Sequence, residues 1–132
     1  ETFAPELNHL LLTKDKVCCI LNISNRHWLL LCLVNEKVFF VDSIGKSLES
    51  YSPICAALIL RSGREVRELP FRLQSDSSEL CSVYCLFFAR KILTQETSWD
   101  RLCLIFSPIQ LARNDGIVLR WFRHVFLGES RR

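Results

Sequence analysis

The sequence predicts a single α+β domain in which a mainly antiparallel sheet is packed by helices. Three observations lead to this prediction. Short apolar runs broken by polar residues fill the first third of the chain, and longer apolar segments at helical spacing fill the second half. Glycine and proline are scarce, with four of each in 132 residues of which 49% are hydrophobic. A chain of this length and composition can bury a substantial core, so we expect one domain over residues 1–132.

Three consecutive runs near the N-terminus are typical of strands. They are KVCCILNI (16–23), HWLLLCLV (27–34) and KVFFVDS (37–43). A tight turn at Asn35-Glu36 joins the last two, and runs of this kind favour antiparallel hairpins. The segment EVRELPFRL (65–73) is a fourth candidate, which Pro70 places at a sheet edge or a bulge.

Helices are marked by their boundaries and by their length. Ser52 as N-cap, Pro53 at the first helical position and Gly63 just past the end delimit one helix. The apolar segment from Cys81 to Leu93 is too long for an ordinary strand and is interpreted as a buried helix. Ser98 caps a shorter one.

The last helix is predicted behind Asn114 or Asp115 as its cap, because apolar residues recur there at helical spacing. These residues are Ile117, Val118, Trp121, Phe122, Val125 and Phe126. The element order is therefore β-β-β-α-β-α-α-α, which is typical of an α+β fold.

Composition excludes several classes of protein. No apolar run is long enough to span a bilayer and no secretory signal is visible, so we expect no membrane association. The net charge of +3 is compatible with an acidic partner without demanding one. No CxxC pair occurs and the histidines do not cluster with cysteines, which argues against a zinc site.

The chain has seven cysteines, an odd number, mostly inside apolar runs: Cys18, Cys19, Cys32, Cys55, Cys81, Cys85 and Cys103. This usage is typical of reduced, buried thiols and predicts a reducing, intracellular compartment.

Cys81 stands where the polar run from Gln74 to Glu79 changes into the predicted buried helix. With Ser77 or Ser78 as N-cap, the thiol falls in the first helical turn. There the unpaired N–H groups and the helix dipole favour a thiolate, and such sites lower a thiol pKa from about 8.5 to roughly 3.5–7.5. Cys81 is therefore a candidate nucleophile.

A catalytic thiol also needs a base and a residue that orients the base. His27 opens the second strand and Asp42 ends the third, so a hairpin would bring the two side chains together at one edge of the sheet. The Gln74 side chain and the backbone N–H of Cys81 could then stabilise an oxyanion. Taken singly, each residue has an ordinary structural interpretation: a small helix hydrophobe, a surface histidine, a turn aspartate and a solvated glutamine. The joint pattern favours the catalytic one.

This pattern resembles the adenovirus protease (adenain) family and, more distantly, the SUMO-deconjugating (Ulp-type) proteases of the same clan. The matching pieces are RHWLLLCLV with VFFVDSIG, LQSDSSELCSVYC with its second cysteine at Cys85, and the tail PIQLARNDGIVLRWFRHVFL. The resemblance implies a papain-like cysteine protease fold with the nucleophile at the start of a buried helix. It also implies the catalytic set Cys81, His27, Asp42 and Gln74.

The function implied by the resemblance is a viral cysteine endopeptidase that cleaves precursor or structural proteins after small, glycine-containing motifs. Trp28, beside the base, is interpreted either as a core aromatic or as a lid over a narrow substrate channel. Such an enzyme would act in the host nucleus and in the virion. Two alternatives use the same fold. One is an isopeptidase that removes a ubiquitin-like modifier, and the other is a catalytically inactive structural module.

The chain departs from adenain at several positions. Asp42 stands where adenain usually has Glu, Ser82 stands where the family has Gly, and the segment before residue 16 is shorter. Adenain is activated by a peptide that forms a disulfide, but GREVRELPFRL (63–73) has no cysteine. We therefore expect that activity requires no cofactor. A peptide bound non-covalently to an edge strand and non-specifically bound DNA remain candidate activators. The basic residues considered for DNA are Arg61, Arg64, Arg67, Arg72, Arg120, Arg123, Arg131 and Arg132; their alternative interpretation is a solvated surface.

Overall fold

The fold is organised around β2 (His27–Val34), a strand with only apolar residues after its first position. The computed structural model describes residues 3–24, 26–76 and 78–128. β2 pairs antiparallel with β1 (Lys16–Ile23) on one side and with β3 (Lys37–Val41) on the other. Only Asn35 and Glu36 separate β2 from β3. The three predicted strands and their tight turn are therefore confirmed.

The sheet is mainly antiparallel, as predicted, and the fourth strand is the exception. β4 (Glu65–Glu68) pairs with β3 in parallel, so the sheet is mixed and has the order β1-β2-β3-β4. A parallel neighbour requires a crossover connection, which α2 (Leu48–Tyr51) and α3 (Pro53–Ser62) provide. β4 is also shorter than the predicted segment 65–73. It ends before Pro70, which lacks the N–H group that a longer ladder would need.

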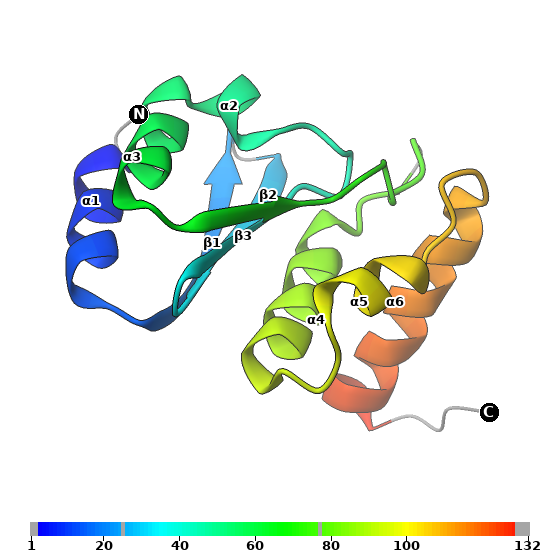
Figure 1. Ribbon diagram of the computed structural model, residues 1–132. Helices are drawn as coiled ribbons and strands as arrows, with labels where there is room; N and C mark the ends of the chain where they lie inside the picture. The colour runs from blue at the N-terminus through cyan, green and yellow to red at the C-terminus, as the bar shows by residue number, and fades with distance from the viewer. Residues whose placement is uncertain (1–2, 25, 77, 129–132) are drawn as a thin grey trace.

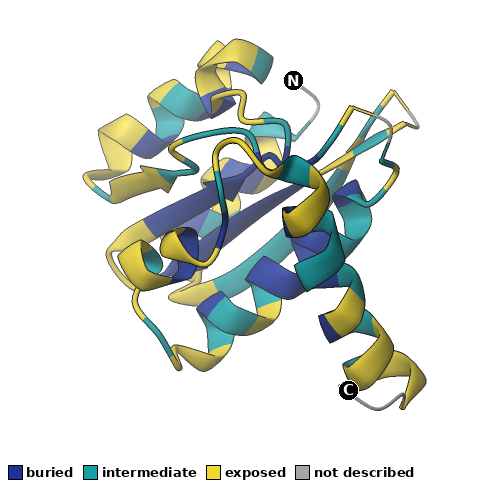
Figure 2. Cartoon of the chain, turned by 90° about the vertical axis from the view of Figure 1, so that its right-hand side faces the viewer, coloured by how far each residue is buried: buried dark blue, intermediate teal, exposed yellow. Residues whose placement is uncertain are grey.

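Helices cover both faces of the sheet (Figure 1). α1 (Ala4–Thr13) and α3 lie on one face, and α4 (Cys81–Thr94), α5 (Trp99–Leu104) and α6 (Leu111–Leu127) lie on the other. The strands accordingly form the buried centre between more exposed helices (Figure 2).

The β2 side chains alternate between the two cores. Leu29, Leu31 and Leu33 belong to the apolar cluster with α1 and α3. Leu30, Cys32 and Val34 belong to the cluster with α4 and α6. Because both faces of β2 are buried, its sequence lacks the alternation of polar and apolar residues seen in half-exposed strands.

Several helix boundaries agree with the sequence. The Ser52 hydroxyl accepts a hydrogen bond from the Cys55 N–H at 3.1 Å, and Gly63 ends α3 in a left-handed conformation with φ of 79°. Ser98 caps α5 through the Arg101 N–H. α1 and α2 were not predicted. α2 has four residues and little to distinguish it from a connecting segment, whereas α1 has ten residues and carries usable signals, Pro5 near its start and Leu7 and Leu11 one turn apart.

Two predicted caps are wrong. α6 begins at Leu111 with Gln110 as its cap, so Asn114 and Asp115 lie inside the helix, where they make tertiary contacts described below. The cap of α4 is Leu80, which makes no side-chain capping bond, and Ser78 precedes it. Ser77, the other predicted cap, lies outside the described residues.

The expectation that all cysteines are reduced is wrong for one pair. Cys18 and Cys32 face each other across β1 and β2 and form a disulfide, with their Cα atoms 4.1 Å apart. Their register positions bring the two side chains to the same face of the sheet, which the sequence spacing alone does not reveal. The remaining five cysteines are free thiols. No helix within the described ranges is long and apolar enough to cross a membrane.

Candidate active site

His27 and Asp42 meet at one edge of the sheet, as the hairpin geometry predicts. His27 is the first residue of β2 and Asp42 follows the last residue of β3. The Nε2 atom of His27 lies 2.6 Å from Oδ1 of Asp42. Asp42 is 1% exposed, whereas the His27 side chain is 20% exposed. The imidazole is therefore anchored through Nε2, and its Nδ1 atom remains for a second partner.

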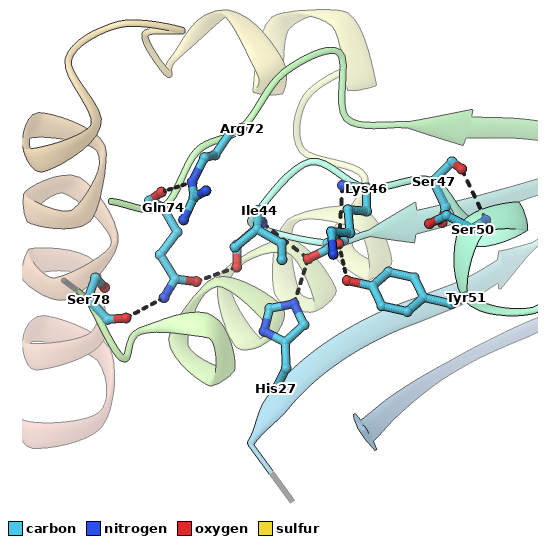
Figure 3. A network of polar contacts seen from close by, with 11 residues as sticks. His27, Ile44, Lys46, Ser47, Ser50, Tyr51, Arg72, Gln74 and Ser78 are labelled. Carbon is cyan, nitrogen blue, oxygen red and sulfur yellow. Dashed lines mark hydrogen bonds and ion pairs between the residues drawn. The ribbon is translucent and has the colours of Figure 1, made fainter. Parts of the chain in front are cut away.

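The Asp42 carboxylate is held by further donors (Figure 3). The Ile44 N–H donates to Oδ1 at 3.1 Å and the Lys46 N–H donates to Oδ2 at 3.2 Å. The Tyr51 hydroxyl donates to Oδ2 at 2.6 Å. Burial and this bond raise the pKa of Tyr51 above its ordinary value, so the tyrosine keeps its proton at neutral pH. These bonds stabilise a buried carboxylate and fix the oxygen that His27 contacts.

Gly45 allows the loop after Asp42 to fold in this way. Its φ of +83° lies in the left-handed region, and a Cβ atom there would lie 3.0 Å from the backbone nitrogen of Arg72. The loop therefore packs directly against the backbone that leads to Gln74. A side chain at position 45 would separate the two segments.

Cys81 is the first residue of α4 and is buried. Its backbone N–H has no acceptor within the helix, and the positive end of the helix dipole lies beside its thiol. α4 packs against β2, the strand that carries His27. α4 begins three residues after Ser78, whose carbonyl accepts a hydrogen bond from the Gln74 side chain (Figure 3).

Cys85, one helical turn further, is a different kind of thiol. Burial is the main cause that raises the pKa of Cys85 to about 12, and the nearby Asp42 carboxylate adds to this shift. Cys85 is therefore protonated at neutral pH and is a poor nucleophile.

Gln74 is buried, so its alternative interpretation as a solvated glutamine is wrong. It is 5% exposed. Its Nε2 atom donates to the Ser78 carbonyl at 2.7 Å, and its Oε1 atom accepts from the Ser43 hydroxyl at 2.5 Å. A carboxamide nitrogen carries two hydrogens, so one N–H remains after the bond to Ser78.

α6 fixes the residues on both sides of Gln74. The Asn114 amide donates to the Leu73 carbonyl at 3.1 Å. The Asp115 carboxylate accepts from the Ser75 hydroxyl at 2.6 Å and from the Tyr84 hydroxyl at 2.7 Å. These buried and partly buried polar contacts explain why Asn114 and Asp115, in the interior of α6, are polar.

Trp28 lies at the surface and does not belong to the core. It is 37% exposed and pairs with Asn22 of β1. The interpretation of Trp28 as a core aromatic is therefore wrong. Its interpretation as a lid over a substrate channel stays a prediction.

Sequence reasoning missed Tyr51 and Ser43 as members of the site. Ser43 directly follows Asp42 in the sequence, and this position next to the candidate acid could have identified it as a member of the site. Tyr51 lies on α2, a helix of four residues that carried no recognisable sequence signal. In the part of the chain that is described, no group of three or more His, Cys, Asp or Glu side chains could hold a metal ion.

No family model and no curated protein matches the chain. Among solved structures the chain is similar to the SUMO protease Ulp1 with its catalytic cysteine oxidised to a sulfonic acid. The two are 14% identical, the match covers 80% of this chain and 55% of the other, and the TM-score is 0.47. This chain thus spans about half the length of that one. The sheet with helices on both faces is a mixed α+β architecture. The resemblances to adenain and to the SUMO-deconjugating proteases stay predictions.

Proposed function

We propose that the chain is a cysteine protease domain in which Cys81 is the nucleophile, His27 the base and Asp42 the residue that orients the base. The observation that carries the proposal is the 2.6 Å contact between His27 Nε2 and a buried, multiply bonded Asp42 carboxylate. A buried carboxylate held against a partly exposed imidazole is expected where an imidazolium must be stabilised. Cys81 supplies a thiol at the start of a helix, where a thiolate is favoured.

The proposed reaction has two halves. His27 takes the Cys81 proton, the sulfur attacks the peptide carbonyl carbon, and the remaining Gln74 N–H and the Cys81 N–H stabilise the oxyanion. The intermediate collapses to a thioester as His27 gives its proton to the leaving amine. Water then attacks the thioester, His27 accepts a proton from it, and the acid product and the free thiol are released.

For the substrate we propose protein chains cut after small, glycine-containing motifs, as in adenain, with action in the host nucleus and the virion. Removal of a ubiquitin-like modifier is the alternative, because it needs the same chemistry at a Gly-Gly terminus. An activating peptide at the outer edge of β4 remains a proposal. DNA is less well supported, because Arg64, Arg67 and Arg72 make contacts within the chain.

The proposal is tested by cleavage of Gly-Gly peptides and of modifier fusions by the wild type, Cys81→Ala and His27→Ala. We expect both variants to lose cleavage and to remain folded. Cys55→Ala, which removes a buried free thiol in the opposite core, is the matched control and should retain cleavage. A thiol-reactive peptide probe should label Cys81 in the wild type and not in His27→Ala. Equal labelling of the two proteins, together with absent cleavage, would indicate an inactive structural module.

A further inference from the structure

We propose that Ser43 is a positioning residue that orients the Gln74 carboxamide for oxyanion stabilisation; this inference rests on the function proposed above. Ser43 follows the candidate acid Asp42 in the chain. Its hydroxyl lies 2.5 Å from Gln74 Oε1, and the two residues are 2% and 5% exposed. The bond is therefore shielded from water, and no solvent molecule can readily replace either partner.

The partners of Gln74 define which end of the amide faces each neighbour. The Ser78 carbonyl can only accept a hydrogen bond, so the atom 2.7 Å from it must be the Gln74 nitrogen. The Gln74 oxygen consequently faces Ser43, and the Ser43 hydroxyl must donate. A flipped amide would place two carbonyl oxygens against each other at Ser78.

Two bonds are needed because the last torsion of a glutamine side chain is intrinsically soft. The bond to Ser78 alone fixes one end of the amide and leaves its plane free to rotate. The second bond, from Ser43, fixes the plane and therefore the direction of the remaining N–H. An acceptor bond on the oxygen also polarises the amide and strengthens its N–H groups as donors.

Ser43 holds the backbone of the same residue. Its carbonyl accepts hydrogen bonds from the N–H groups of Leu73 and Gln74, both at 2.9 Å. The Ser43 side chain and main chain thus position the side chain and main chain of Gln74, respectively. Since Asp42 is the preceding residue, one dipeptide sets both the acid that orients His27 and the predicted oxyanion donor.

The main-chain bonds allow the side-chain role to be tested separately. Ser43→Ala removes the hydroxyl and keeps the carbonyl that holds the Gln74 backbone. We expect a fall in kcat of about tenfold or more, bounded by the 10² to 10³ typical of losing a whole oxyanion donor, with KM nearly constant. Ser50→Ala is the matched control, because Ser50 is an exposed serine whose hydroxyl bonds only locally to Ser47. It should leave kcat unchanged.

A double-mutant cycle distinguishes positioning from a general structural effect. If Ser43 acts through Gln74, Ser43→Ala should cost nothing further in kcat when Gln74 is already alanine. Additive losses, or full kcat in Ser43→Ala, would overturn the inference. Loss of activity in Cys81→Ala and His27→Ala would still support the proposed function in that case.

An activity-independent measurement completes the test. The side-chain NH₂ signals of Gln74 in a ¹H–¹⁵N spectrum are assigned by their absence in Gln74→Ala. We expect Ser43→Ala to shift these signals and to accelerate their hydrogen exchange, and Ser50→Ala to leave them in place. Unchanged signals in Ser43→Ala would refute the positioning role whether or not the chain cleaves peptides.

Discussion

Tyr51 donates a hydrogen bond of 2.6 Å to Oδ2 of Asp42, while His27 contacts Oδ1 of the same carboxylate. The tyrosine and the histidine therefore contact different oxygens of the carboxylate and do not compete with each other. The bond from the tyrosine also restricts rotation of the carboxylate. Tyr51 also packs against Phe40, with ring centroids 6.2 Å apart, which connects α2 to the sheet. The acid is thus oriented by an element that the sequence did not reveal.

Tyr51→Phe should lower kcat/KM by about tenfold or less, because the ring remains and only the bond to Asp42 is lost. The free energy of unfolding should fall by about 1–3 kcal/mol, since hydrogen bonds to charged groups are worth more than neutral ones. Peptide-cleavage kinetics and urea denaturation measure the two effects. An unchanged kcat/KM with reduced stability would assign Tyr51 a purely structural role.

Gln74→Ala should lower kcat by roughly 10² to 10³ with KM nearly constant, as expected for a donor that acts in the transition state. Because Gln74 is buried and bonded to Ser43 and Ser78, the variant should also melt at a lower temperature. Steady-state kinetics below the unfolding transition separate the two effects. A variant with full kcat would remove Gln74 from the proposed mechanism.

Cys85 should resist alkylation, because its thiol has a pKa of about 12 and is buried. In the unfolded chain an ordinary thiol ionises near pH 8.5. Between about pH 9 and 12 the Cys85 thiol is therefore protonated in the folded state and mostly ionised in the unfolded state. Stability should therefore decrease as pH rises through this window, by at most about 1.4 kcal/mol per pH unit from this group. Urea denaturation at pH 8, 9 and 10 measures the decrease. Cys85→Ala should reduce the slope; an identical slope would show that other groups cause it.

Removal of the disulfide should destabilise the domain by about 3 kcal/mol, the value typical of a closed loop of about 15 residues. Cys18 and Cys32 are separated by 14 positions in the sequence. Cys18→Ala and chemical reduction should lower the free energy of unfolding equally. Cys19→Ala, which alters a neighbouring free thiol, is the control. Alkylation in denaturant, followed by intact-mass measurement before and after reduction, would reveal the bond directly, and a denatured protein with seven alkylatable thiols without reductant would contradict it.

Local sequence signals predicted much of the fold. The strands around β2 and the limits of α3 follow from apolar runs, from Ser52 and Pro53, and from Gly63. The parallel pairing of β4 could not be predicted in this way, because it depends on how α2 and α3 return the chain to β3. The disulfide could not be predicted for a similar reason, since the register that places Cys18 opposite Cys32 is a property of the folded sheet.

The meeting of His27 and Asp42 could be predicted, because a hairpin brings the start of one strand beside the end of the next. The environment of Gln74 could not. Its burial depends on a loop folded through Gly45 and on contacts from α6, which begins 37 residues later in the sequence. A polar segment such as the one around Gln74 has the same sequence character whether it is solvated or covered by another element.

The contacts of α6 with the Gln74 loop have a consequence for biosynthesis. Asn114 and Asp115 hold Leu73 and Ser75, so the geometry around the candidate oxyanion donor depends on residues translated after Cys81. A growing chain that has just released α4 from the ribosome already contains Cys81, His27 and Asp42, but it lacks these tethers. The site described here is complete only once α6 has emerged and packed, which delays its assembly until nearly all of the sheet and its helices are in place.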